Sequence, residues 1–327
     1  MCYSAGQQVP LGGCLKHLKN QNEENIMMKN LTSAITKAVL ALSACAALNA
    51  NAGTAVAAKT VAEDKDESLF ALAGIDMTGT MEVGWDSRYY FRGLWFADHT
   101  AWGGFSASVP LKGISDKLTF NFGALYTSNV ETKVNSGLFD EKLEYSELDL
   151  IGSLTYDFDF LKATLVYTSY QFFDGFSGTT ATTGSFGAGE FNIAHTNELG
   201  FVLTSTLGPV NVSTGYYYDF NIGGSYFEVG ADYPIKVASF LTLIPAVKAG
   251  YGLDYYSDIS ARANGGIPGG VTSGITHAIA SLAAPVNLTK SVTLTPYVAY
   301  NFSGRARESI NTTDNEVFGG VKLGVSF

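Results

Sequence analysis

The feature that most constrains this chain is an alternation of apolar and polar residues that begins near Thr78 and recurs to the C-terminus. In the first such segment one face is apolar and consists of Met81, Val83, Trp85, Tyr89 and Phe91. The other face is small or charged and consists of Glu82, Gly84, Asp86, Arg88 and Arg92. A period of two indicates strands with one apolar face. Small residues mixed with opposite charges on the polar face favour a confined lumen over a sandwich surface facing bulk water.

Comparable segments recur along the chain, two of them weaker and richer in Ala, Gly and Ser. They lie near 101–110, 117–127, 147–156, 161–168, 198–207, 210–219, 227–233, 241–251, 275–286, 292–302 and 317–327. Bacterial single-chain barrels use even strand numbers. The sequence therefore predicts an all-β fold, a transmembrane antiparallel up-and-down β-barrel of about 12 strands (range 10–14), closed by its N- and C-terminal strands.

The connections between these segments alternate in length. Short turns are expected near 112–116, 157–160, 208–209, 234–239 and 287–290. Longer connections are expected near 128–141, 173–190, 254–271 and 303–314, with an intermediate loop at 93–100 and a short exception at 221–224. Short periplasmic turns and longer outer loops are typical of outer-membrane barrels, which predicts both chain ends on the periplasmic side.

An export segment precedes the alternating region. Lys29 and Lys37 supply positive charge, residues 38–48 supply a short apolar run, and Ala50 and Ala52 frame a cleavage site. The run is shorter than the ~20 apolar residues of a membrane-spanning helix. Residues 1–27 are expected to be a start-site extension, 28–52 the signal peptide, 53–77 a periplasmic tail and 78–327 the barrel. Lipidation at Cys45 is the alternative to cleavage after Ala52.

The composition narrows the function classes. The chain of 327 residues carries 20 basic and 30 acidic residues and lacks a basic stretch, so we expect no nucleic-acid partner. Its three cysteines, Cys2, Cys14 and Cys45, all precede the expected cleavage site. We expect an exported protein of the bacterial outer membrane, in contact with membrane lipid and without a cofactor.

The C-terminal strand carries a pattern of its own. Val321, Leu323, Val325 and the terminal Phe327 share one face. Alternating apolar residues that end in an aromatic residue resemble the assembly signal of outer-membrane barrels. The resemblance implies that this strand is recognised by the barrel assembly machinery.

A second segment is more specific. Residues 86–93 read Asp-Ser-Arg-Tyr-Tyr-Phe-Arg-Gly and are followed by Trp-Gly-Gly-Phe at 102–105. Over roughly 78–110 this resembles the N-terminal signature of the TorF-like family of outer-membrane porins, although Leu94, Trp95 and Phe96 replace smaller polar residues. The resemblance implies a channel. From the residues alone, Arg92 is expected at the outer rim on the lumen side, in line with Arg88. There Arg92 and Gly93 are expected to fix a strand end and its turn, and recognition of a solute by Arg92 is the alternative.

The predicted inward charges number eight acidic and six basic residues. They are Glu82, Asp86, Arg88, Arg92, Lys117, Glu147, Asp149, Lys162, Glu198, Asp219, Glu228, Asp232, Lys248 and Lys322. They form either a paired network in a closed lumen or a polar path with a slight cation preference. We expect a narrow pore for small polar solutes. The alternative is a structural or adhesion barrel with a plugged lumen.

The sequence gives little support for an enzymatic function. An outer-membrane lipase would need a Ser–His pair near the rim, but no G-x-S-x-G signature surrounds Ser273 and His277. His99, His195 and His277 are expected to be ordinary rim residues, and we expect no catalytic site. No metal motif is present, and Asp254 with Asp258 is a weak signal.

Overall fold

The computed structural model describes the chain in several stretches. They are residues 2–4, 7–9, 76–130, 132–135, 140–143, 145–173, 178–179, 190–191, 195–221, 223–255, 273–304 and 315–327. A small hairpin of β1 (Cys2–Ser4) and β2 (Gln7–Val9) belongs to a unit of its own, Met1–Ala46. The expected signal peptide, its cleavage site at Ala50 and Ala52, and residues 53–75 of the expected tail lie outside the described residues.

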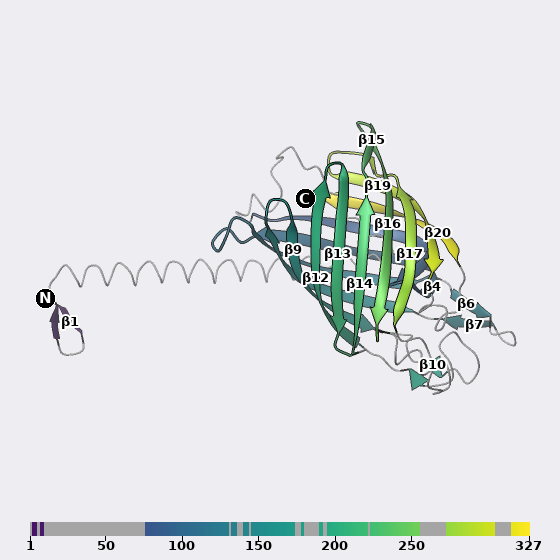
Figure 1. Cartoon of the computed structure of the whole chain (residues 1–327), viewed down its shortest axis with the longest axis horizontal. Helices are drawn as coiled ribbons and strands as arrows, with labels where there is room; N and C mark the ends of the chain where they lie inside the picture. Colours follow the sequence, from purple (N-terminus) through teal and green to yellow (C-terminus); the bar gives the residue numbers. More distant parts are fainter. Residues whose placement is uncertain are drawn as a thin grey trace. The chain divides into compact units, whose positions relative to one another are not determined.

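The second unit is a closed barrel of twelve antiparallel strands (Figure 1). The strands are β3 (Thr78–Phe91), β4 (Leu94–Pro110), β5 (Leu118–Asn129), β8 (Ser146–Asp157), β9 (Lys162–Phe172), β12 (His195–Leu207), β13 (Val210–Asp219), β14 (Gly224–Asp232), β16 (Leu241–Leu253), β17 (Gly274–Ala283), β19 (Val292–Ser303) and β20 (Glu316–Ser326). Each pairs with the next, and β20 pairs with β3 to close the barrel, Val321 opposite Trp85. The predicted fold class and its closure by the terminal strands are confirmed.

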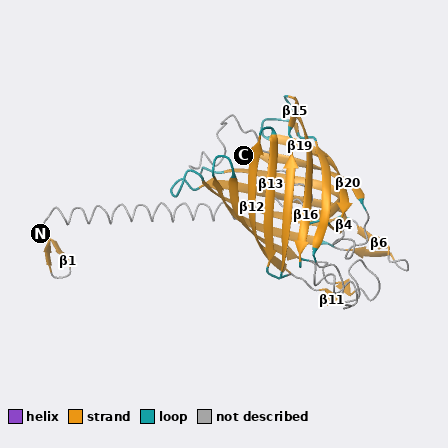
Figure 2. Ribbon diagram, viewed as in Figure 1, coloured by secondary structure: helices purple, strands orange, loops and turns teal. Residues whose placement is uncertain are grey.

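Smaller strands decorate the barrel, as Figure 2 shows in orange. β15 (Ile235–Ala238) pairs with β16, and β18 (Val286–Asn287) bridges β16 and β19. The hairpins β6 (Thr132–Asn135) with β7 (Asp140–Leu143) and β10 (Gly178–Thr179) with β11 (Glu190–Phe191) lie in two of the long connections. No helix in the described residues is long and apolar enough to cross a membrane.

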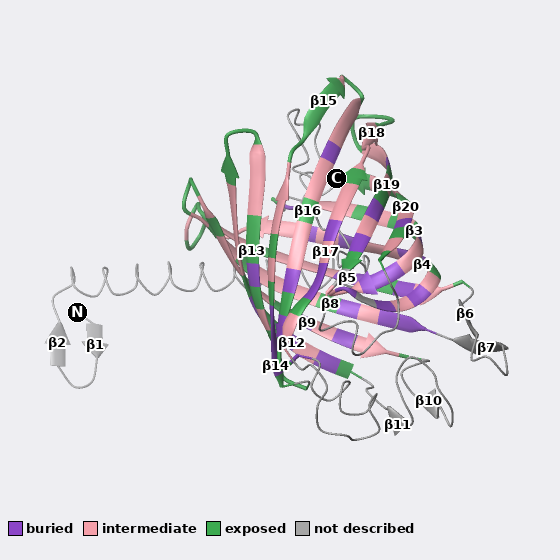
Figure 3. Cartoon of the chain, turned by 45° about the vertical axis from the view of Figure 1, so that its right-hand side comes forward, coloured by how far each residue is buried: buried purple, intermediate pink, exposed green. Residues whose placement is uncertain are grey.

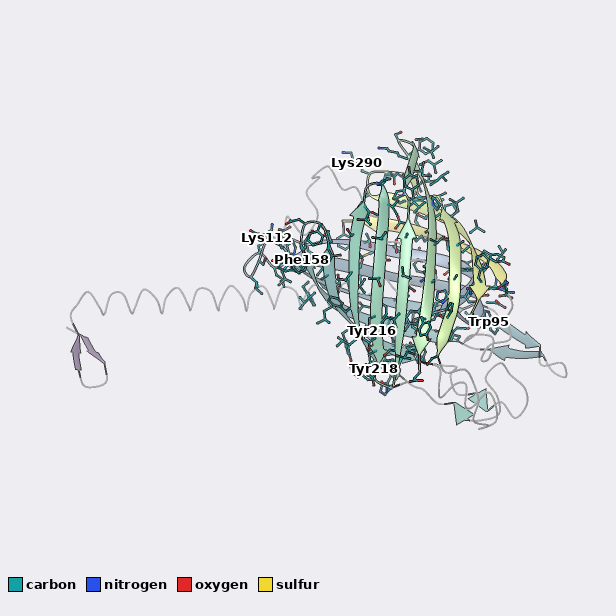
Figure 4. The ribbon with its side chains drawn as sticks, in the orientation of Figure 1. Trp95, Lys112, Phe158, Tyr216, Tyr218 and Lys290 are labelled. Atoms are coloured by element: carbon teal, nitrogen blue, oxygen red, sulfur yellow. The ribbon has the colours of Figure 1, made fainter. Side chains whose placement is uncertain are left out.

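The two ends of the barrel differ in their connections. One end, here the turn end, carries Thr78, Phe327 and the short turns 111–117, 158–161 and 208–209. The other, the loop end, carries the connections after β5, β9, β16 and β19, parts of which lie outside the described residues. Lys112, Phe158 and Lys290 mark the turn end in Figure 4, whereas Trp95, Tyr216 and Tyr218 lie towards the loop end.

The prediction of an intermediate loop at 93–100 is wrong. β4 already begins at Leu94, so only Arg92 and Gly93 connect β3 to β4. Both residues have positive φ, 50° and 83°, as the centre of a type I′ hairpin turn requires. Such a turn is compatible with the twist of two paired strands, and the hairpin therefore continues where a loop was expected.

The outer face of the wall is apolar. Val83, Val229 and Val247 are each more than half exposed, and large apolar side chains recur at alternate positions around the barrel. Val321, Leu323 and Val325 of β20 belong to this surface. Phe327 packs at the turn end against a cluster that contains Met77, Phe105 and Phe122.

Candidate functional site

The hairpin β3–β4 leaves the barrel wall before it turns. The β3–β20 ladder ends at Asp86, opposite Gly320, and the β4–β5 ladder begins at Thr100, opposite Asn129. Between these points the two arms pair with each other, for example Arg88 with Asp98. We call residues 87–99 the inner hairpin.

Two irregularities allow this departure. His99 has φ 49°, a left-handed conformation that is uncommon for a non-glycine residue and bends β4. The register also shifts between Tyr89 and Tyr90, and such a bulge re-aims the side chains that follow it. Tyr89 and Tyr90 are both buried, at 3% and 0% exposed, although neighbouring residues of a wall strand should point to opposite faces.

The tip of the inner hairpin reaches the opposite side of the barrel. The Arg92 side chain is 8% exposed and forms an ion pair with Glu198 of β12. Its guanidinium carbon lies 4.7 Å from the ring centroid of Tyr217, 4.5 Å from that of Tyr226 and 5.0 Å from that of Tyr255. Tyr217 and Tyr226 belong to β13 and β14, which lie opposite β3 and β4 in the closed order of strands. We call Glu198 and these three tyrosines the Arg92 cage.

Gly93 fits the tip closely against the wall. A Cβ at this position would lie 2.5 Å from His277 Nδ1 and 2.7 Å from His277 Cβ, and φ is +83°. Both the backbone conformation and the available space therefore require glycine. His277 is 1% exposed and its ring is parallel to that of Tyr226, with centroids 6.4 Å apart. The prediction of an ordinary rim histidine at 277 is wrong, because the inner hairpin covers this side chain.

Both sides of the inner hairpin contact the wall. On one side the Tyr89 hydroxyl donates to Glu147 Oε2 at 2.8 Å, and the Tyr145 hydroxyl donates to the same oxygen. On the other side Tyr90 and Trp95 pack in one cluster with Ile279, Ala299 and Phe318. Arg88 bridges Asp98 and Glu316 at the edge. The inner hairpin thus occupies the loop-end half of the lumen.

Buried carboxylates surround this half. Asp86 accepts hydrogen bonds from Trp102 Nε1 at 2.8 Å and from the Tyr297 hydroxyl at 2.6 Å. Asp219 accepts one from the Thr196 hydroxyl at 2.5 Å. Glu147 and Asp149, two residues apart on β8, are 2% and 1% exposed. These residues give the loop-end half a concentration of buried carboxyl groups.

The turn-end half of the lumen has a different lining. Ser108 donates to Asn121, whose side-chain amide donates to Ser153 at 3.2 Å and Thr155 at 3.0 Å. Lys322 pairs with Glu82 at 2.8 Å. Most buried side chains cluster in the loop-end half, while the turn end is intermediate or exposed, as the pink and green strand ends of Figure 3 show.

Many of the predicted lumen charges form ion pairs across strands, ion pairs at the rim, or hydrogen bonds. Glu82–Lys322, Glu228–Lys248 and Arg92–Glu198 pair across strands. Lys117 and Lys162 instead sit at the turn-end rim, paired with Asp159 and Asp157, and are 44% and 57% exposed. Asp232 accepts a hydrogen bond from Asn211 at 2.9 Å. Whether any of the predicted set lines a conducting path stays a prediction.

Three placements differ from the sequence analysis. Arg92 lies inside the lumen and not at the rim. Tyr89 and Phe91 do not belong to the apolar outer face, because β3 has left the wall at these positions. The cage tyrosines and Glu316 were missed, although the unbroken run Tyr89-Tyr90-Phe91 violates the period of two and marks the departure.

The described residues hold no group of three or more His, Cys, Asp or Glu side chains arranged to bind a metal ion. Asp254 Oδ1 accepts a hydrogen bond from Ser273 Oγ at 3.2 Å. Asp258 lies outside the described residues.

Several solved barrels resemble the chain. The COG4313 outer membrane channel from Pseudomonas putida F1 is 11% identical over 77% of this chain and 95% of its own, with a TM-score of 0.43. The translocator domain of the autotransporter NalP from Neisseria meningitidis is 10% identical over 78% and 91%, with a TM-score of 0.44. The NanC porin is 10% identical over 76% and 98%, with a TM-score of 0.41. At these identities and TM-scores the likenesses do not identify a function.

No family model matches the chain, and no curated protein does. The resemblance to TorF-like porins therefore stays a prediction.

Proposed function

We propose that this chain is an outer-membrane barrel that conducts small polar solutes through a narrow channel, and that the inner hairpin sets its bore. The observation that carries the proposal is the division of the lumen. A half lined by small polar residues meets a half occupied by a hairpin with no ladder to the wall beyond Asp86 and Thr100. A purely structural barrel would not need the polar lining that the turn-end half of the lumen has.

The membrane location rests on the wall itself. A closed barrel satisfies every backbone group along its wall, which is the condition for crossing hydrocarbon with strands. The apolar residues on alternate outward positions supply the surface that lipid tails prefer. We place the turn end in the periplasm, with Phe327 in the strand recognised during assembly.

The chemistry of the lumen favours small polar solutes with a slight preference for cations. The acids Asp86, Glu147 and Asp219 are buried in the loop-end half, and hydroxyl and amide groups line the turn-end half. A ring of acidic groups lowers the barrier for cations relative to anions.

Planar-bilayer recording tests the proposal with the wild type and a variant whose residues 88–98 are replaced by Asn-Gly. This dipeptide closes a type I′ turn directly between Ser87 and His99. We expect small, fluctuating conductance steps from the wild type and several-fold larger, steady ones from the shortened variant. Absence of discrete conductance in both proteins would overturn the proposal.

The alternative of a plugged structural or adhesion barrel has one observation in its favour, since the inner hairpin is anchored on both sides by Glu147 and Phe318. Trimming residues 173–190 and 254–271 separates the two functions. A lost adhesion phenotype with unchanged permeability would favour the alternative.

Catalysis is not part of the proposal. Ser273 Oγ donates to Asp254, and His277 Nδ1 shares a hydrogen bond with Thr276 Oγ1 at 2.9 Å. Phospholipid hydrolysis that is lost in His277→Ala would revive the lipase alternative.

A further inference from the structure

The Arg92 cage has the composition of a receptor for organic cations. Three tyrosine rings lie within 5.0 Å of the guanidinium carbon, and Glu198, 2% exposed, supplies the opposite charge. Aromatic faces attract cations most strongly when both are removed from water, by about 2 kcal/mol or more. A planar carboxylate adds the paired geometry that a guanidinium prefers.

The wall holds this cage in shape by contacts among its own residues. The rings of Tyr217 and Tyr226 are 6.3 Å apart, and those of Tyr226 and Tyr255 are 5.8 Å apart. The Tyr226 hydroxyl donates to Glu228, which also pairs with Lys248 at 2.9 Å. Tyr217 of β13, Tyr226 of β14 and Tyr255, two residues beyond β16, therefore contact one another without help from the side chain that fills the cage.

The occupant comes from an element that the wall holds by side chains and not by a backbone ladder. Arg92 is the tip of the inner hairpin, which has no ladder to β20 or β5 over residues 87–99 apart from the bond from Val130 N to His99 O. A side chain on a hairpin that is held by side-chain contacts and not by a backbone ladder can be replaced by a free molecule of the same chemistry, because the free molecule forms the same contacts with the cage.

We propose that the Arg92 cage is a binding site for guanidinium-bearing and similar organic cations, and that such a solute opens the channel by taking the place of Arg92. The inference rests on the proposed function and names its preferred solute class. Neutral molecules of the same shape lack the charge that the tyrosine faces and Glu198 recognise. Anions are repelled by Glu198 and by Asp219, which is fully buried beside it on β13.

A free solute has to compete with the Arg92 side chain for the cage, and this competition sets the solute concentration that is needed. A tethered group acts at an effective concentration in the millimolar range or above, so a free solute must reach about 10 mM to displace Arg92 from the wild type. Replacing Arg92 removes the competing side chain, so a lower solute concentration is then sufficient for binding.

Calorimetric titration of the purified barrel in detergent tests binding without reference to conduction. The probes are guanidinium chloride and urea, which has the same planar shape without the charge, both far below denaturing concentrations. We expect Arg92→Ala to bind guanidinium at least about ten-fold more tightly than the wild type and to ignore urea. In the Arg92→Ala background, Glu198→Gln should abolish the binding.

Folding is checked in parallel by heat-modifiable gel mobility and by circular dichroism, and Arg92→Gln replaces Arg92→Ala if the latter does not fold. No guanidinium binding to a folded Arg92 variant, or equal response to urea, would overturn the inference.

Bilayer recording then links the site to the channel. Guanidinium at about 10 mM should raise the open probability of the wild type several-fold, whereas urea and equal sodium chloride should not. If the wild type conducts but guanidinium neither binds nor changes gating, the inference fails while the proposed function stands. If guanidinium binds to Arg92→Ala but neither protein conducts, the proposed function fails while the binding site stands.

Discussion

The two halves of the lumen are built by the same twelve strands yet have opposite character. The turn-end half is lined by short polar side chains such as Ser108, Asn121 and Thr155, which bond to one another. The loop-end half is filled by the inner hairpin and by the aromatic and acidic residues that receive it. The difference teaches that a barrel can gain a core from its own wall, when one hairpin bends inwards at His99 and carries its side chains to the far side.

The largest expected effect comes from Trp95→Ala. The indole packs with Ile279 and Phe318, and removing a buried side chain of this size costs about 3–5 kcal/mol. The cost falls on the docked inner hairpin, so we expect a strong rise in open probability in bilayer recordings. Phe201→Ala on the exposed outer face of β12 is the matched control and should leave gating unchanged. Equal gating in both variants would contradict an anchoring role for Trp95.

A smaller shift in the same direction is expected for Gly93→Ala. Position 93 combines positive φ with a Cβ clash against His277, which together cost about 2–4 kcal/mol. Gly208 also has positive φ, 61°, but nothing lies within 4 Å of its Cβ position. Gly208→Ala therefore carries the backbone strain alone. Recordings should show more frequent opening in Gly93→Ala than in Gly208→Ala, and identical behaviour would mean that the tip does not need its close contact.

In the turn-end half, Lys322→Gln should change selectivity and leave gating intact. The substitution removes the partner of Glu82, whose side chain is 11% exposed. It therefore leaves the turn-end half of the lumen more acidic. We expect the reversal potential in a potassium chloride gradient to move towards the cation value by a few millivolts. An unchanged reversal potential would show that these residues do not line the path.

The smallest effect is expected at the turn-end rim. Lys117 pairs with Asp159 in an exposed turn, and surface pairs of this kind contribute little because water screens them. Lys117→Gln should leave both conductance and refolding yield unchanged. A measurable change in selectivity would extend the conducting path to this rim.

The wall was predictable from the sequence because its physics is local. Wherever a strand stays in the wall, one residue faces outwards and the next faces the lumen, so the period of two identified the strands. The pairing of β3 with β20 followed from closure. Val83 and Leu323, for example, face outwards as predicted and lie opposite each other.

The inner hairpin was not predictable by the same rule. Once β3 leaves the wall after Asp86, both of its faces are buried, and Tyr89 and Tyr90 can be apolar together. The turn at Arg92 and Gly93 was predicted, but its two-residue length was not, because Arg is not among the residues that favour positive φ, in contrast to Asn or Asp. Arg92 pays that conformational cost where Glu198 and three tyrosines bind it, and these partners come from distant segments that only the closed barrel brings together.

The seam between β3 and β20 also orders events in time. The first and last strands of the wall pair with each other, so the wall cannot close until the final residues of the chain are present. The two arms of β3–β4 are adjacent in sequence, and contacts of such short separation form early, within microseconds for a hairpin. We therefore expect the hairpin to form before the barrel closes, so that it can serve as a template that brings β12, β13 and β14 to their final positions.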